Sequence, residues 1–240
     1  MEKTLSVLVI ANRRKPLAKK MKAEIGRFLI SNNARLCGAK GKPGLVVSVG
    51  GDGTVLFGKR HYGIPYFAIG SKTSFLCQSD FSNWKLRLSR AISRLRFDRR
   101  LLLEGRLDGM PLPLALNEIG IRNPQPRILS IHLHSGKRHY AFRADGVLFS
   151  TPTGSPAYCY SCGGREMEPS DSRYQAVAIS PFRRLFSPKV FPKGTTCTIR
   201  ISGGERAQLF IDGQPFGPFT TKNVLRVKGS KTQFLFAKSD

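Results

Sequence analysis

Residues 45–54 read LVVSVGGDGT, a short apolar run followed at once by three glycines and one acidic residue. A continuous apolar run bounded by glycine is typical of a strand that is buried in a sheet. Glycines at the carboxyl end of a strand let the chain turn sharply and leave backbone N–H groups exposed. If a helix follows, those groups and the helix N-terminus form a cradle for a phosphate group. The stretch therefore predicts an α/β unit with an anion-binding loop.

Asp52 lies in the middle of this predicted cradle. A carboxylate there would repel a phosphate unless it contacted a metal ion or took part in a proton transfer. The loop matches neither the P-loop pattern nor the G-x-G-x-x-G dinucleotide fingerprint. A plain Gly-Asp-Gly turn between two elements is the simpler alternative, and the loop alone leaves it open.

The residues around this loop alternate between strand-like and helix-like stretches. Such alternation predicts a parallel sheet with helices on its faces. Strands are expected at 5–11, 45–49 and 66–69, and helices at 16–29, 54–59 and 83–97.

The character of the sequence changes after about residue 105, where short strands joined by turns dominate. Hairpin-type turns are expected at 135–137, 203–205 and 229–231, and one helix begins near Ser155. The strands are expected at 114–122, 128–134, 139–150, 176–180, 197–202, 207–212, 224–227 and 233–237. The predicted organisation is an α/β domain over 1–106, which carries the glycine loop, and a mostly β domain over 107–240. The extreme C-terminus is expected to be able to pack back on the first domain.

The chain is strongly basic, with 40 Lys and Arg against 15 Asp and Glu in 240 residues, a net charge of +25. Such a surface attracts polyanions, which include nucleic acids, acidic membranes and phosphorylated small molecules. Arg87, Arg90 and Arg94 recur at helical spacing. Because Leu88, Ile92 and Leu95 supply the apolar face of the same segment, the arginines are interpreted as a solvated helix face. No nucleic-acid-binding motif accompanies the charge, so nucleic acid is not an expected partner.

The cysteine pattern and the N-terminus favour a cytoplasmic location. The five cysteines are odd in number and widely spread, which indicates a reducing compartment rather than a disulfide framework. Cys159 and Cys162 form a single C-x-x-C without the second ligand pair that a zinc site needs. No apolar run is long enough to cross a membrane, and no signal-peptide cleavage site follows the N-terminus. His132, His134 and His139 flank an expected hairpin turn and are interpreted as surface residues, so no metal ligands are predicted.

Residues 145–158 read DGVLFSTPTGSPAY and pass from a strand, through a turn rich in hydroxyl groups, into a helix. Ser155 is a suitable N-cap and Pro156 suits the first helical position. Hydroxyls and free N–H groups at a helix start can bind a phosphate or a ribose, and Tyr158 offers a ring for stacking. The run is longer than an ordinary helix cap requires, which favours a binding role.

A shorter signal is the pair Asn117-Glu118 within the expected strand 114–122. Adjacent side chains of a strand face opposite ways, so at least one of these polar groups points into a packed or binding face. An Asn amide matches an adenine edge, and a Glu carboxylate accepts hydrogen bonds from ribose hydroxyls.

Together these motifs resemble the NAD kinase family. The resemblance rests on GGDGT, on Asn117-Glu118, on the 145–158 run closing with Gly163-Gly164, and on Asp212-Gly213-Gln214, in that order over roughly 7–214. Lipid kinases share the GGDGT loop, whereas the STPTG run is much more specific.

The resemblance implies an α/β domain and a β-rich domain with the active site between them. It implies phosphorylation of the 2′-hydroxyl of the adenosine ribose of NAD, with ATP or polyphosphate as donor and Mg²⁺ or another divalent cation beside it. Asp52 would be the general base or orienting group, and catalysis would rest mainly on positioning and charge neutralisation. A homodimer or homotetramer is implied, in which a neighbouring subunit would contribute some site residues.

The other site residues also follow from the resemblance. Gly51, Gly53 and Thr54 would lie beside the phosphates, and Asn117 with Glu118 would hold the ribose and pyrophosphate. Phe75 would pack near the adenine, and Asp212 would complete the site. The adenine and nicotinamide sub-sites would be lined by Asp145, Thr153, Ala157, Tyr158 and Ser161, and Arg143 would also contact the nucleotide.

The chain departs from the family pattern at three places. Pro156 stands where Ser or Thr is usual, and Arg165-Glu166-Met167-Glu168 follows the Gly163-Gly164 pair, where apolar residues are commoner. Ser71-Lys72-Thr73-Ser74-Phe75-Leu76 stands where the family has Gly-x-Leu-Gly-Phe-Leu. Activity is expected to survive, since Asp52, Asn117, Glu118 and Asp145 are all present, but donor or substrate preference could differ.

Two other functions remain compatible with the sequence. One is a lipid or other small-molecule kinase that shares only the GGDGT loop. The other is a non-catalytic basic protein, binding RNA or sensing NADP on a retained kinase scaffold.

Overall fold

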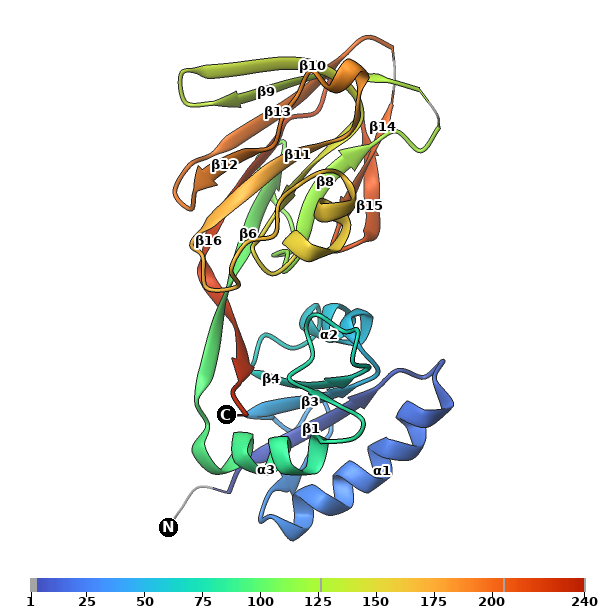
Figure 1. Cartoon of the computed structure of the whole chain (residues 1–240), viewed down its shortest axis with the longest axis vertical. Helices are drawn as coiled ribbons and strands as arrows, with labels where there is room; N and C mark the ends of the chain where they lie inside the picture. Colours follow the sequence, from blue (N-terminus) through green and yellow to red (C-terminus); the bar gives the residue numbers. More distant parts are fainter. Residues whose placement is uncertain (1–3, 126, 205, 240) are drawn as a thin grey trace. The chain divides into compact units, whose positions relative to one another are not determined.

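A computed structural model describes residues 4–125, 127–204 and 206–239 and divides the chain into two compact units. Unit 1 comprises the chain up to Arg99 together with the segment from Phe234 onward, and unit 2 is Arg100–Gln233. The chain passes between the units in two strands, β6 (Phe97–Leu107) and β16 (Leu225–Ala237) (Figure 1). The domain boundary expected at 106/107 falls at the end of β6.

The sheet of unit 1 is parallel, as the alternation of strands and helices predicted. Its central strands are β1 (Ser6–Ala11), β3 (Leu45–Val49) and β4 (Tyr66–Gly70), with β3 in the middle. Short strands β2 (Arg35–Leu36) and β5 (Ser79–Asp80) flank them. The end of β16 pairs in parallel with β4, with Phe236 opposite Tyr66. Every residue of β3 and β4 is buried, which explains their continuous apolar sequences.

Three helices cover this sheet: α1 (Pro16–Ser31), α2 (Asp52–Lys59) and α3 (Trp84–Arg94). Figure 1 shows α2 on one face and α1 with α3 on the other. The buried side chains of α1 recur every three or four residues and join the core of unit 1. They include Ala18, Met21, Ile25 and Leu29.

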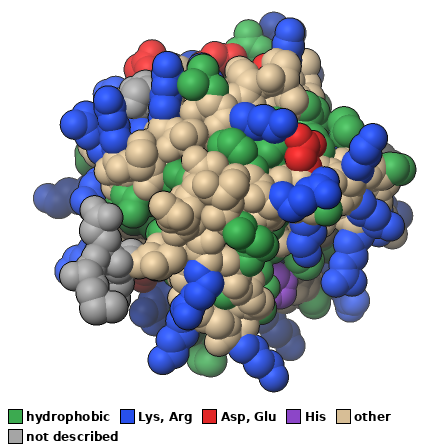
Figure 2. Space-filling model, turned by 90° about the horizontal axis from the view of Figure 1, so that it is seen from below, with side chains coloured by type: hydrophobic (Ala, Val, Ile, Leu, Met, Phe, Trp, Pro, Cys, Tyr) green, Lys and Arg blue, Asp and Glu red, His purple; other side chains and the backbone are tan. Residues whose placement is uncertain are grey.

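Helix α3 ends three residues before the expected end at Phe97. Leu95 adopts a left-handed conformation, with φ 42°, and is 38% exposed, so it does not extend the apolar face. The solvated face is confirmed, because Arg87, Arg90 and Arg94 are all exposed. In the view of Figure 2, Lys and Arg side chains project around the visible face, and acidic side chains there are few.

Unit 2 is mostly antiparallel, which confirms the predicted β-rich second half. Its main sheet has the order β15-β14-β8-β10-β9-β13-β16. The long strand β10 (Arg138–Ser150) pairs with β9 along its first half and with both β8 and β11 along its second half. The remaining strands are β7 (Met110–Pro111), β8 (Glu118–Arg122), β9 (Leu129–Ser135), β11 (Arg173–Pro181), β12 (Lys189–Pro192), β13 (Cys197–Ser202), β14 (Ala207–Ile211) and β15 (Gln214–Phe219).

Two of the three expected hairpin turns are wrong. The turn at 135–137 does join the paired strands β9 and β10. The turn at 229–231 does not exist, because β16 continues through it from Leu225 to Ala237. The segment expected to turn at 203–205, whose Glu205 lies outside the described residues, connects β13 to β14, and these strands pair with other partners.

No helix in the described part of the chain has the length and apolarity that crossing a membrane requires.

Candidate active site

The glycine loop of unit 1 has the sharp geometry that its sequence predicted. Gly50 and Gly51 adopt φ values of 140° and 113°, which side-chain-bearing residues rarely adopt. A Cβ on Gly50 would lie 2.7 Å from both Asn12 Cβ and Thr54 Oγ1, so only glycine fits. Helix α2 begins immediately at Asp52, and the N–H groups of its first turn that lack helical acceptors open at this loop. The predicted anion cradle is therefore formed by the backbone.

Thr54 adds a side-chain donor to this cradle. It is only 7% exposed, and its Oγ1 has no hydrogen-bond partner within the described residues. Buried polar atoms are nearly always paired, so this unpaired hydroxyl is an exception, but it has almost no accessible surface through which a bound group could contact it.

Asp52 fastens a second loop to the start of α2. Its Oδ2 accepts a hydrogen bond from the Phe75 N–H and its Oδ1 accepts one from the Leu76 N–H, both at 3.0 Å. Phe75 is 66% exposed. The carboxylate thus has a structural task that the sequence did not indicate. Oδ1 also accepts from the Cys77 thiol at 3.9 Å, so Oδ2 is the oxygen that keeps a lone pair for a further hydrogen bond.

In unit 2, Asp212 holds the segment that carries Asn117 and Glu118. Asp212 is 3% exposed, and its Oδ1 accepts hydrogen bonds from the N–H groups of Leu116, at 2.9 Å, and Asn117, at 2.7 Å. The Asp212 N–H donates to the Glu118 carbonyl at 2.9 Å. These bonds join residues nearly a hundred positions apart. Asn117 precedes β8 instead of lying within it, so the expectation of a strand beginning at 114 is wrong.

The hydroxyl-rich turn packs against the same segment. Thr151 donates from Oγ1 to the Leu116 carbonyl and from its N–H to the Asn117 carbonyl, the latter at 2.9 Å. A Cβ on Gly154 would lie 2.4 Å from the Asn117 carbonyl oxygen. The glycine of the STPTG run is therefore required by the close approach of two backbones.

Two predicted binding residues of this cluster present unsatisfied polar atoms. Asn117 is 9% exposed and Thr153 is 6% exposed. Neither Asn117 Oδ1 nor Thr153 Oγ1 has a hydrogen-bond partner within the described residues. An amide oxygen and a hydroxyl are suited to the hydroxyl and amide groups of a nucleotide, but these two atoms have almost no accessible surface, so their surroundings would have to move before a ligand reached them.

Glu118 is almost fully buried beside this cluster. Burial raises the pKa of its carboxyl to about 7, with the negative charge of Asp212 adding to the effect and the Gly213 N–H opposing it. Since an ordinary Glu has a pKa near 4.5, the folded protein holds this proton more tightly than the unfolded chain does.

A stability prediction follows from Glu118. Below pH 4.5 the carboxyl is protonated in both states, and between pH 4.5 and 7 the unfolded chain ionises first, so stability falls as pH rises. Relative to Glu118→Gln, the wild type should lose about 3 kcal/mol of unfolding free energy across that window, at about 1.36 kcal/mol per pKa unit. Denaturant unfolding at a series of pH values measures this, and equal pH slopes for the two proteins would contradict it. Glu166→Gln, at an exposed position, controls for the change of formal charge.

The expected helix at Ser155 is a five-residue π-type turn, η1 (Ser155–Cys159), in which Ala157 leaves the helical region with ψ −130°. Ser155 is not the N-cap: its Oγ donates to the Pro152 carbonyl at 2.7 Å and accepts from the Met167 N–H at 2.8 Å. Gly154 precedes the turn, so Pro156 stands at its second position. The serine was misassigned because it bonds backward and across to residue 167 instead of to the helix start.

Tyr158 extends from this turn toward a second group of side chains. Its ring lies 6.1 Å from that of Phe210, and its hydroxyl is hydrogen-bonded with Arg122. Arg122 pairs across the sheet with Gly146, which places it next to Asp145. Tyr158 and Asp145 therefore belong to one neighbourhood.

Arg143 and Ser161 lie apart from these groups. The Arg143 guanidinium lies 5.2 Å from the Phe182 ring centroid, and Ser161 is exposed. Arg143 is seven residues along β10 from Ser150, the residue that pairs with Glu118, a separation of about 20 Å at strand rise. Its predicted role in nucleotide binding remains a prediction.

The cysteines and histidines show no metal-binding arrangement: within residues 4–125, 127–204 and 206–239, no group of three or more His, Cys, Asp or Glu could hold a metal ion. All five cysteines are free. Burial raises the pKa of Cys159 to about 12 and that of Cys162 to about 11. His134 and His139 stack at 4.2 Å on the partly exposed surface of the β9–β10 hairpin.

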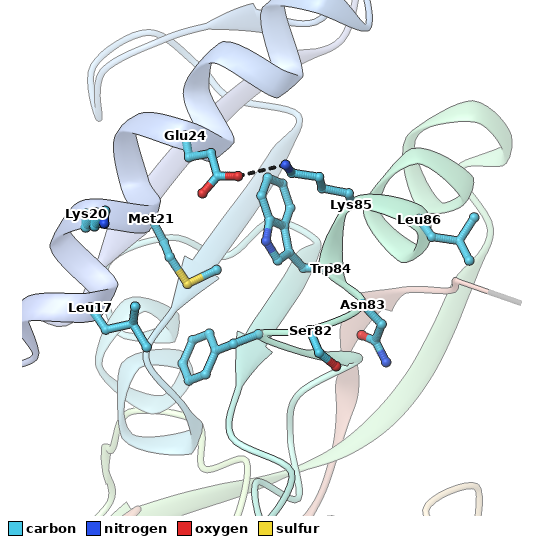
Figure 3. A pocket seen from close by; sticks show the side chains of 10 residues that line it. Leu17, Lys20, Met21, Glu24, Ser82, Asn83, Trp84, Lys85 and Leu86 are labelled. Atoms are coloured by element: carbon cyan, nitrogen blue, oxygen red, sulfur yellow. Dashed lines mark ion pairs between the residues drawn. The ribbon is translucent and has the colours of Figure 1, made fainter.

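A cavity of about 670 Å³ lies elsewhere in unit 1, between α1 and the start of α3 (Figure 3). Lys85 crosses it to pair with Glu24 at 2.8 Å and lies above the Trp84 ring. None of its lining residues belongs to the predicted site.

One functional candidate was missed by sequence reasoning. Lys15 belongs to none of the sequence motifs described above, yet its Nζ donates to the Gly50 carbonyl at 2.8 Å. The signal was available, because Lys15 follows the strand that neighbours β3 in a parallel sheet, and the carboxyl ends of parallel strands share one edge.

A parallel α/β unit with an anion cradle, joined to a β unit with buried carboxylates and open polar atoms, defines a nucleotide-dependent phosphotransferase. A sequence model of the ATP-NAD kinase C-terminal domain matches residues 116–239. The NAD kinase of Methanospirillum hungatei is 31% identical over 199 residues, which cover 81% of this chain and 74% of that protein. That of Nitratidesulfovibrio vulgaris is 30% identical over 97% of this chain and 86% of its own length. The chain belongs to the NAD kinase family.

Two solved structures show the same fold. Yeast NADH kinase, crystallised with NADH, matches with a TM-score of 0.89 at 20% identity, covering 100% of this chain and 84% of that one. The NAD kinase of Archaeoglobus fulgidus, crystallised with ATP, matches with a TM-score of 0.84 at 23% identity, covering 98% and 94%.

Proposed function

We propose that this chain phosphorylates the 2′-hydroxyl of the adenosine ribose of NAD to give NADP, with ATP as the donor. The observation that carries the proposal is the pairing of family membership with an Asp52 carboxylate held at the mouth of a backbone anion cradle. The match of residues 116–239 to the ATP-NAD kinase C-terminal domain supports a nucleotide site in unit 2.

The cradle of unit 1 would receive the donor phosphates. Phosphoryl transfer needs little covalent help from a protein and depends on positioning and charge stabilisation. The amides at the start of α2, with the positive end of its dipole, supply both without any movement of a side chain.

Asp52 would accept the proton of the attacking hydroxyl. A ribose hydroxyl is a poor nucleophile at neutral pH, and a positioned base contributes about 10²- to 10⁴-fold to such a step. The two backbone N–H bonds to Asp52 fix the direction of its remaining lone pairs. This pre-orients the carboxylate for one incoming hydroxyl.

Unit 2 would hold the dinucleotide. Asn117 Oδ1 and Thr153 Oγ1 are suited to ribose or carboxamide groups. Glu118, with a pKa raised to about 7 by burial, can either accept or donate a hydrogen bond to a ribose hydroxyl near neutral pH. Tyr158 provides an aromatic face for a base or nicotinamide ring.

The cofactor and partners expected from the sequence remain predictions. Mg²⁺ in kinases usually keeps several waters and binds through one or two carboxylates plus the phosphates of the substrate, and Asp52 could be such a carboxylate. Bound with the donor, the ion would offset phosphate charge. Polyphosphate as a second donor, a homodimer or homotetramer, and a cytoplasmic location also remain to be tested.

A coupled assay for NADP tests the function directly. NAD and NADH are each offered with ATP or polyphosphate, and the product is checked by an NADP-specific dehydrogenase. We expect NADP from NAD and ATP, and turnover of NADH alone would redefine the acceptor. Silence with both donors would favour a lipid or small-molecule kinase, or a protein that only binds its ligand.

A further inference from the structure

The turn between β1 and α1 is built against the glycine loop. The Asn12 N–H donates to the Val49 carbonyl at 2.9 Å, and the Lys15 N–H donates to the Asn12 carbonyl at 3.1 Å. Asn12 Oδ1 accepts from the Arg14 N–H at 2.9 Å. The backbone of this turn is therefore held in one place relative to Gly50.

Lys15 extends from that turn over the loop. Its Nζ donates to the Gly50 carbonyl at 2.8 Å and lies 4.0 Å from the point where a Cβ of Gly51 would be. An ammonium group has three donors, and this contact uses one. The other two have no hydrogen-bond acceptor among the described residues.

Ser74 lies on the same side of Gly51. Its Oγ is 3.3 Å from the Gly51 Cβ position and 3.2 Å from the Ser71 hydroxyl. The space that glycine leaves open is thus bordered by an ammonium group and a hydroxyl group. Ser74 is also one of the residues that stand where the family pattern has glycine, so the hydroxyl is an addition to that pattern.

We propose that Lys15 and Ser74 bind a phosphate oxygen of the donor over the open face of Gly51. The proposal rests on the proposed function, because it assigns the cation and hydroxyl that face the donor in the same cradle. A triphosphate carries several negative charges, and the Lys15 ammonium, bonded to the Gly50 carbonyl, would lie nearer to them than the lysines of α1, so its Coulomb attraction would be stronger. Lys15 and Ser74 are donor-binding residues that position the phosphate beside Asp52.

Steady-state kinetics with separate KM values test this assignment. Lys15→Met keeps the length of the side chain and removes its charge, and Lys22→Met makes the same change at an exposed site on α1. We expect Lys15→Met to raise the KM for ATP by about 10- to 100-fold, the range of a hydrogen bond to a charged group, with the KM for NAD unchanged. Lys22→Met should leave both KM values as in the wild type.

Two Ser74 variants separate the hydroxyl from the backbone. Ser74→Ala removes the hydroxyl, and Ser74→Gly restores the residue of the family pattern. We expect each to raise the KM for ATP by about 10-fold, the lower end of the range for a hydrogen bond to a charged group. The substitution Lys15→Arg keeps the positive charge. It should therefore keep part of the ATP affinity that Lys15→Met loses.

Several outcomes would overturn the assignment. Equal KM values for ATP in Lys15→Met and Lys22→Met would do so. A rise in the KM for NAD alone in Lys15→Met would also contradict it. If Lys15→Met lost thermal stability and kcat while both KM values stayed unchanged, Lys15 would have only a structural role.

Calorimetric binding of ATP to the full chain needs no turnover. If the wild type formed no NADP, the proposed function would fail while this titration still tested Lys15. ATP affinity unaffected by Lys15→Met would then overturn the inference by itself.

Discussion

Replacing Asp52 by Asn is expected to lower kcat for NADP formation by about 10²- to 10⁴-fold, the contribution of a positioned general base. The amide is isosteric but cannot take a proton, and its NH₂ group would face a backbone N–H of Phe75 or Leu76. One of those two hydrogen bonds is therefore lost as well. Initial rates with saturating ATP and NAD measure the effect on kcat.

Asp80→Asn is the matched control for that substitution. Asp80 also lies in unit 1, at the end of β5, and its Oδ1 accepts hydrogen bonds from the N–H groups of Ser82 and Asn83. It should retain the kcat of the wild type. A loss below about tenfold in Asp52→Asn would be too small for a general base.

Limited proteolysis separates the two tasks of Asp52. If the carboxylate mainly fastens the loop, Asp52→Asn should expose residues 71–77 to cleavage in proportion to the activity lost. If it mainly acts as a base, activity should fall far more than protection. A binding protein without catalysis would keep its NADP affinity in this variant.

Asp212→Ala should lower the free energy of unfolding by about 2–5 kcal/mol. The substitution leaves the N–H groups of Leu116 and Asn117 buried without an acceptor, at about 1–3 kcal/mol each. Residue 212 has a φ of 48° with either side chain, so the backbone conformation adds little to the difference between variant and wild type. Denaturant titration measures the loss.

Asp108→Ala is the control for the second prediction. Asp108 has a φ of 51°, and its carboxylate accepts from the Val224 N–H at 2.7 Å and from the Asn223 amide. Because Asp108 is exposed, water can replace its carboxylate as an acceptor, and its removal should cost clearly less. Equal losses in the two variants would mean that burial does not determine the effect of Asp212.

Much of the fold could be predicted because apolar runs and glycines act locally. The runs at β1, β3 and β4 are buried on both faces, so their sequences alone indicated strands. The glycine loop was predictable for the same reason, since positive φ at Gly50 and Gly51 leaves few residue choices. Strand β6 was missed because Asp98, Arg99 and Arg100 interrupt its apolar pattern.

The types of residue in the site could be predicted from the sequence, but the hydrogen bonds between them could not. Asp212 satisfies N–H groups 95 and 96 residues away, and a pairing of that range leaves no mark in local sequence. Ser155 was misread because its hydroxyl bonds to Met167 and not to a helix start. Lys15 was overlooked because basic residues are so common in this chain that a single lysine did not indicate a binding role.

Because β16 returns to unit 1, it determines which fragments of the chain can fold and when the sheet of unit 1 is completed during synthesis. Phe236 is 1% exposed and pairs with Tyr66, and the Phe234 ring lies 5.1 Å from the Tyr66 ring. An expressed fragment ending at Arg99 would leave that edge of β4 bare, prone to aggregate through its open backbone groups. During synthesis, unit 1 must wait for residue 236 to emerge before its sheet is complete, so the two units finish folding together.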